Sequence, residues 1–245
     1  SITIQDNYFG TADGSTLVVD NIIYQPIKLY FVNGSTPTVT ITNNIVYNSL
    51  LGIELGSTNA ASQGSVETLN CLGSSVNSGV TISNNKIGLN ASNEITDRNY
   101  FGQGGWSLFG IYVCSMRSVL ISNNNIANST GFFSLDKGID IEFSEFTLRD
   151  NNIGAIRNTD GSPHTDTDWA IFGYGIYVNG NSIDGNLNSN IVNNLVANVS
   201  IPLSPSVVSA LCIGSYSLNA AGRVCGGTAL MLNVTSNNNV YNNTF

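Results

Sequence analysis

The chain has 245 residues, of which 16 are Asp or Glu and 8 are Lys or Arg, and its formal net charge is -8. Charged residues make up 10% and hydrophobic residues 42%, a composition that argues against a disordered tail. The sequence has no basic cluster to bind nucleic acid or an anionic membrane, and no apolar run near the roughly 20 residues of a membrane span.

Two kinds of short segment alternate along the chain. The first runs into asparagines, mostly paired, and occurs at 2–9, 39–46, 80–87, 119–126, 146–153, 187–196 and 232–245. The second precedes most of these and often contains Gly-Ile, at 26–32, 51–56, 109–115, 137–143, 174–180 and 228–234. Both alternate apolar with small polar residues, which predicts strands of about three to five residues.

The spacing of these segments predicts a solenoid. From Ile111 to Ile139 the full cycle takes 28 residues, about one turn of a three-sided coil. Each strand would pair with its equivalent in the next coil at about 4.8 Å, and asparagines would stack into an amide ladder at the corners. The corner pairs expected are 43–44, 84–85, 123–124, 151–152, 193–194 and 237–238.

The strand segments "VTISNNKI" and "VLISNNNI", with "FGIYV" and "YGIYV" before other strands, resemble the right-handed parallel β-helix proteins of the pectin-lyase-like superfamily. The resemblance implies an all-β fold, a single-stranded right-handed parallel β-helix of about 6–8 coils with loops projecting from one corner. Residues 1–245 would form one such domain, a segment of a longer chain or a subunit of an assembly. This superfamily includes polysaccharide lyases, hydrolases, epimerases, tailspikes, adhesins and carbohydrate-binding proteins, so the fold leaves the activity open.

Long interruptions at 86–110, 153–174 and 195–228 should leave the solenoid at the same corner, where a binding surface is expected. Two of them end in similar aromatic segments that contain Trp106 with Phe109 and Trp169 with Phe172. These four aromatic side chains are the candidate carbohydrate-binding residues, because aromatic faces stack on sugar rings. The alternative is that they cover the core beneath the loops.

The stretch 158–169 concentrates Asp160, Asp166 and Asp168, which are candidate calcium ligands on a polar loop. Its opening "NTDG" resembles a motif of polygalacturonases, in which Asp160 would correspond to a catalytic carboxylate. The other motifs of those enzymes are absent from this sequence. A solvated polar loop is the alternative, and no cofactor other than calcium is expected.

The segment 137–143 contributes a pair of candidate catalytic carboxylates. Asp140 and Glu142 should point outward by alternation while Ile139, Ile141 and Phe143 point inward. On an exposed face the two carboxylates could act as acid and base if a cleft raised one pKa. A solvated acidic strand near Lys137 is the alternative.

Two further sets of residues concern an extracellular location. Sequons for N-glycosylation occur at Asn33, Asn90, Asn128, Asn198, Asn233 and Asn242. Asn128, Asn198 and Asn242 each lie four residues after the second asparagine of an expected corner, and Asn90 lies five after, which predicts a stripe of glycans with a further polar corner as the alternative. Four cysteines without zinc-site spacing suit an oxidising compartment, with Cys71–Cys114 and Cys212–Cys225 as the expected disulfides and four free thiols as the alternative.

The ends of the chain fall inside repeat segments, so we expect a neighbouring part of a larger assembly to cover them. The sequence therefore predicts an extracellular structural or surface protein of a cell envelope, filament or virion spike, with glycans or neighbouring subunits as partners. The alternative is a polysaccharide-degrading enzyme, a glycoside hydrolase or lyase, on the same fold.

Overall fold

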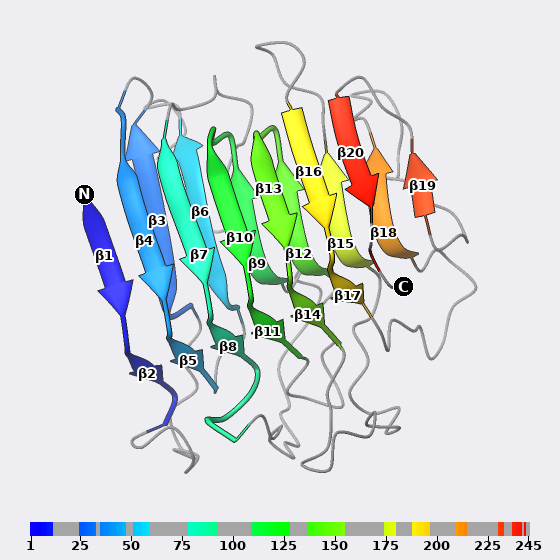
Figure 1. Cartoon of the computed structure of the whole chain (residues 1–245). Coiled ribbons are helices and arrows are strands. Elements are labelled where there is room, and N and C mark those ends of the chain that lie inside the picture. Colours follow the sequence, from blue (N-terminus) through cyan, green and yellow to red (C-terminus); the bar gives the residue numbers. More distant parts are fainter. Residues whose placement is uncertain are drawn as a thin grey trace, which may run out of the picture.

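The computed structural model describes residues 1–11, 25–32, 35–47, 51–58, 78–92, 109–127, 137–154, 174–179, 188–196, 209–214, 230–232, 237–241 and 243. Within these ranges the chain forms strands and turns and no helix, which confirms the all-β prediction. The strands belong to three parallel sheets, none of which closes on itself (Figure 1).

Every third strand returns to the same sheet, so one strand from each sheet makes up a coil. The first sheet contains β1 (Ile2–Gln5), β4 (Thr38–Thr42), β7 (Gly79–Ser83), β10 (Val119–Ser122), β13 (Phe146–Arg149), β16 (Asn188–Val192) and β20 (Asn237–Tyr241). The second contains β2 (Tyr8–Phe9), β5 (Ile45–Val46), β8 (Lys86–Ile87), β11 (Asn125–Ile126), β14 (Asn152–Ile153) and β17 (Leu195–Val196). The third contains β3 (Ile27–Val32), β6 (Ile53–Thr58), β9 (Phe109–Cys114), β12 (Lys137–Glu142), β15 (Tyr174–Asn179), β18 (Ser209–Gly214) and β19 (Leu230–Leu232).

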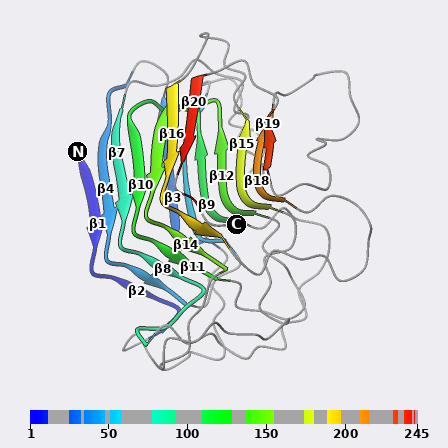
Figure 2. The ribbon, with the colours of Figure 1, turned by 45° about the vertical axis from the view of Figure 1, so that its right-hand side comes forward.

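The stacking is in register from coil to coil. Val80 of β7 pairs with Val39 on one side and with Val119 on the other, and the isoleucines that follow them pair in the same way. The short strands of the second sheet turn away from the ends of the first-sheet strands, as Figure 2 shows. The last strands depart from the simple order, because β19 pairs with β18 before the chain reaches β20.

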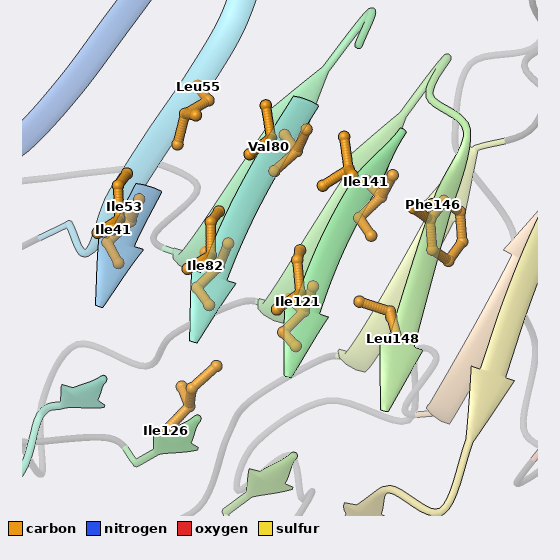
Figure 3. Close-up of a cluster of buried hydrophobic side chains, with 14 of the residues drawn as sticks. Ile41, Ile53, Leu55, Val80, Ile82, Ile121, Ile126, Ile141, Phe146 and Leu148 are labelled. Atoms are coloured by element: carbon orange, nitrogen blue, oxygen red, sulfur yellow. The ribbon is translucent and has the colours of Figure 1, made fainter. Parts of the chain in front are cut away.

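The core lies between the sheets and consists of inward side chains from successive coils, as far as Val196 among the described residues. Ile41, Ile82, Ile121 and Leu148 follow one another along the first sheet, and each is 0% exposed (Figure 3). Ile53 and Ile141 of the third sheet face them across the core. Burial of apolar surface at about 25 cal/mol per Å² supplies the main favourable energy of such a stack.

A ladder of asparagines, buried from Asn44 to Asn194, runs along the corner between the first and second sheets. Its members are Asn7, Asn44, Asn85, Asn124, Asn151, Asn194 and Asn243. Each Oδ1 from Asn44 onward accepts two hydrogen bonds from the asparagine one coil earlier, from its backbone N–H and its Nδ2, at 2.8–3.1 Å. The amide ladder predicted from the sequence is therefore confirmed.

The same side-chain amides also donate hydrogen bonds to the first-sheet strand of the preceding coil. Asn124 Nδ2 donates to the carbonyl of Ile82 at 3.0 Å, and Asn151 Nδ2 donates to that of Ile121 at 3.0 Å. One side chain thus links its own coil with the coils before and after it. Because these asparagines are buried, each bond replaces one that water could not supply.

From Asn7 to Asn194, the residue before each ladder asparagine turns the chain. Asn43, Asn84, Asn123 and Asn193 have φ of 53–57°, and Asp150 has φ of 58°, in the left-handed region that Asn and Asp tolerate. The expected corner at 151–152 is therefore wrong by one residue, and the corner is Asp150 with Asn151. The last corner was expected at 237–238, but those residues begin β20 and the ladder continues at Asn243.

Glycines allow close approach where the third-sheet strands begin. A Cβ on Gly110 would lie 2.6 Å from the carbonyl oxygen of Gly138 and 2.6 Å from Ile126 Cγ2. A Cβ on Gly52 would lie 1.8 Å from the carbonyl oxygen of Gly110. The Gly-Ile segments in the sequence thus reflect coils that pack backbone against backbone.

Candidate functional site

The outer face of the third sheet gathers most of the described ionisable side chains. Register places Lys28, Glu54, Tyr112, Asp140 and Tyr177 in one row across five strands. Adjacent members of the row are about 4.8 Å apart in backbone spacing. Carboxylates and tyrosines therefore alternate along the stack.

Asp140 and Glu142 are not on an exposed face, so this prediction is wrong. They are 4% and 5% exposed, although alternation does place them on the side of β12 opposite Ile139 and Ile141. The reason is the neighbours in register, because Asp140 lies between Tyr112 and Tyr177 of the adjacent strands. Alternation fixes which side of a sheet a residue occupies and leaves open what covers that side.

Each of these two carboxylates is engaged by a neighbour. Asp140 Oδ2 accepts a hydrogen bond from Lys137 Nζ in a buried ion pair. Lys137 Nζ also lies 4.5 Å from the centroid of the Tyr177 ring. Glu142 Oε2 is 3.4 Å from the hydroxyl of Tyr112, which donates to it. This arrangement stabilises two buried carboxylates and leaves neither open to a substrate.

A second group on the same face was missed by the sequence analysis. Glu54 is 5% exposed and accepts hydrogen bonds from Gln25 Nε2 and, at 2.8 Å, from the Tyr30 hydroxyl. Lys28 Nζ lies 3.8 Å from Glu54 Oε2 and 4.8 Å from the centroid of the Tyr30 ring. The signal available in the sequence was "QPIKLYF" aligned with "LGIELG", since that register puts Lys28 beside Glu54.

The surroundings of Glu54 change two pKa values. Burial raises the pKa of Glu54, and the Tyr30 hydroxyl and the Lys28 ammonium oppose that rise only in part. Burial, and then the hydrogen bond to Glu54 and its negative charge, raise the pKa of Tyr30. Tyr30 therefore stays a neutral hydrogen-bond donor throughout the physiological range.

Phe109 is the one predicted carbohydrate-binding residue that lies within the described ranges. It is partly buried, packs against the core, and its ring centroid is 5.2 Å from that of Tyr112. This packing matches the alternative in which the aromatic residues cover the core.

Trp106, Trp169 and Phe172 lie outside the described residues, and so do the loop aspartates Asp160, Asp166 and Asp168. The described ranges contain no group of three or more His, Cys, Asp or Glu side chains that could hold a metal ion.

Asn90 is a sequon that the structure buries. It is 4% exposed, and its Oδ1 accepts a hydrogen bond from the backbone N–H of Ser92 at 2.9 Å. This burial and this hydrogen bond oppose glycosylation at Asn90. The stripe expected through Asn128, Asn198 and Asn242 stays a prediction. The sequons at 33, 128, 198, 233 and 242 lie outside the described residues.

Cys114 is fully buried, and the described part of the chain contains no free cysteine. Cys71 and Cys225 lie outside that part, as does the side chain of Cys212, so the pairing of the four cysteines stays a prediction.

Within the described ranges no helix is long and apolar enough to cross a membrane. No protein-family model, no curated protein and no solved structure matches the chain. The candidate site therefore has to be interpreted from its own geometry.

Proposed function

We propose that the chain is an extracellular structural or surface element of a cell envelope, filament or virion spike. Its fold would be a right-handed parallel β-helix of the pectin-lyase-like type with about six to eight coils. The observation that carries this proposal is the asparagine ladder, in which side-chain amides join coil to coil from Asn7 to Asn243. Such a ladder gives a long and stiff scaffold, which is what a surface element requires.

The carboxylates of the third sheet support a structural role over a catalytic one. Catalysis of glycoside cleavage needs an acid and a second carboxylate that both reach the scissile bond. Glu54, Asp140 and Glu142 are each at most 5% exposed and each is bound by a neighbouring side chain. Glu54 and Glu142 bind tyrosines of adjacent strands, and Asp140 pairs with Lys137 of its own strand.

The partners of this element would be glycans or neighbouring subunits. Glycans would be attached at the sequons other than Asn90, and bound sugars would stack on Trp106, Trp169 and Phe172. Calcium would be held by Asp160, Asp166 and Asp168 in the same loop region. The low charge of the chain favours neutral sugars over polyanionic ones, because a polyanion requires a row of Arg or Lys.

The test combines location with activity. Antibodies raised against the purified chain should label intact cells or particles of the source, without permeabilisation. The purified chain should leave neutral and acidic polysaccharides uncleaved. Labelling only after permeabilisation would contradict the proposed location. Cleavage that disappears in Asp140→Asn or Asp160→Asn would instead establish the polysaccharide-degrading alternative.

A further inference from the structure

Glu54 fastens β3 to β6 on the outer face of the third sheet. Glu54 belongs to β6, while Lys28 and Tyr30 belong to β3, and Gln25 lies just before β3. The carboxylate accepts hydrogen bonds from Gln25 and Tyr30 on different oxygens, at Oε2 and Oε1 respectively. We call these four residues the Glu54 clasp.

The clasp supplies two neutral donors and one positive charge, the partly exposed ammonium group of Lys28. Lys28 Nζ lies 3.8 Å from Oε2, and its side chain is 28% exposed against 7% for that of Glu54. On the other side, register places Tyr112 of β9 next to Glu54, and its hydroxyl donates to Glu142. Among the described groups that face Glu54, the titratable ones are thus Lys28, Tyr30 and Tyr112. An ionised carboxylate in this position loses hydration that its neighbours only partly replace.

A neutral carboxyl group fits the same position. Tyr30 can donate to a protonated carboxyl as well as to a carboxylate, because one oxygen keeps its acceptor lone pairs. A half-turn of the Gln25 amide presents its carbonyl oxygen to the new O–H. Protonation therefore removes the cost of burying the charge and keeps a hydrogen bond to Tyr30 and one to Gln25, while it gives up the attraction between Glu54 and Lys28.

We propose that Glu54 is a proton-operated clasp, which holds β3 against β6 more tightly when its carboxyl group is neutral than when it is ionised. The direction of the effect follows from the surroundings of the group. Because burial raises the folded-state pKa of Glu54 above its ordinary value of 4.5, its stabilising contribution is fully present below 4.5. The contribution is lost as the pH rises through the raised pKa, so mild acid tightens this edge of the stack.

The test is hydrogen exchange of the 27–32 segment in the whole chain at pH 4.5 and pH 8, expressed as protection factors corrected for intrinsic rates. Protection of this segment should be higher at pH 4.5, by up to about tenfold for each unit by which the pKa is raised. Glu54→Gln copies the neutral carboxyl group and should give high protection at both pH values. Glu145→Gln, which removes a partly exposed carboxylate elsewhere in the stack, should retain the pH dependence of the wild type.

Lys28→Met provides a second variant that keeps Glu54 itself. Lys28 favours the ionised form, so its removal should move the loss of protection to higher pH. The proposal is overturned if the wild type shows equal protection at both pH values. It is also overturned if Glu54→Gln is less protected than the wild type at pH 8, or if Lys28→Met moves the transition to lower pH.

Discussion

At each corner two neighbouring residues have separate roles. Asn123 adopts φ of 56° and is exposed, so its contribution is a backbone conformation. Asn124 is 0% exposed, and its amide holds three coils together. The sequence shows both residues as asparagine, and only the burial of the second makes its replacement strongly destabilising.

Replacing a ladder asparagine should therefore be costly. In Asn124→Ala the backbone N–H and the Nδ2 of Asn85 lose their acceptor, and Asn151 Oδ1 loses one of its two donors. A buried polar group without a partner costs about 1–3 kcal/mol, so we expect a loss of at least about 3 kcal/mol in the free energy of unfolding. Denaturant unfolding followed by circular dichroism measures this loss.

The matched control is the preceding residue. Asn123→Gly keeps a left-handed conformation accessible and removes only an exposed side chain, so its effect should lie within about 1 kcal/mol of zero. Equal effects of the two substitutions would show that the amide ladder does not stabilise the fold.

The Lys137–Asp140 pair gives a second prediction. Both side chains are buried, at 9% and 5% exposure, so Lys137→Met leaves the Asp140 carboxylate without its cation. Breaking a buried pair costs about 3–5 kcal/mol. Lys137→Met combined with Asp140→Leu should regain most of that loss, because no uncompensated charge remains. Strictly additive effects in this double-mutant cycle would indicate that the pair is not coupled.

Asn90 supplies a prediction about modification. When the chain is secreted from a glycosylating host, mass spectrometry of its peptides should find Asn90 unmodified, because its side chain is buried and bonded to Ser92. An occupied Asn90 would mean that the turn at 90–92 opens before or during folding. The other sequons serve as internal comparisons in the same spectrum.

The burial of individual polar residues was the least predictable property. Alternation correctly places Asp140 and Glu142 opposite the core, but their cover depends on Tyr112 and Tyr177, which come from other coils. The same holds for Glu54, whose partners lie 24 to 29 residues away. Contacts between coils depend on which residues of successive strands pair with each other. A single sequence indicates this register only where its repeated segments can be aligned clearly.

At the scale of the elements, the repeated segments predicted most strands well. The segments that begin at 39, 80 and 119 correspond to β4, β7 and β10 with the second-sheet strands that follow them. The strand β18 was missed, because "SALCIG" lacks both the Gly-Ile pair and a following asparagine. The corner at Asp150 was misplaced because "RDNNI" offers two asparagines after the aspartate that makes the turn.

The start of the third-sheet strands gives a prediction at this scale. In Gly110→Ala the new Cβ would approach the carbonyl oxygen of Gly138 to 2.6 Å, and backbone atoms cannot move aside as a side chain does. We expect a loss of about 1–3 kcal/mol or more in the free energy of unfolding, as for other overpacked sites. Gly79→Ala in β7 is the matched control, because a Cβ there has nothing within 4 Å. It should be neutral or stabilise by up to about 1 kcal/mol, and a reversed order of the two would refute the packing argument.

At the scale of the whole molecule, the stack is held together by contacts between successive coils. Each strand in the middle of a sheet pairs with one strand on either side, and the asparagine ladder repeats this rule at the corner. Stability in such an architecture is close to a sum of terms for each coil and for each interface between coils. A substitution that strains the interface between two coils should therefore destabilise mainly those coils and their direct neighbours.

Hydrogen exchange along the whole chain of the Gly110→Ala variant tests this expectation. The substitution strains the contact between β9 and β12, so protection should fall most in those strands and in β6, which pairs with β9. Protection in β16 of the first sheet should fall less, because β16 pairs with β13 and β20 and has no direct contact with the strained interface. Gly79→Ala should leave the protection of all these strands unchanged. An equal loss of protection in every strand would mean that the coils unfold as one cooperative unit, which would exclude the nearest-neighbour description of this solenoid.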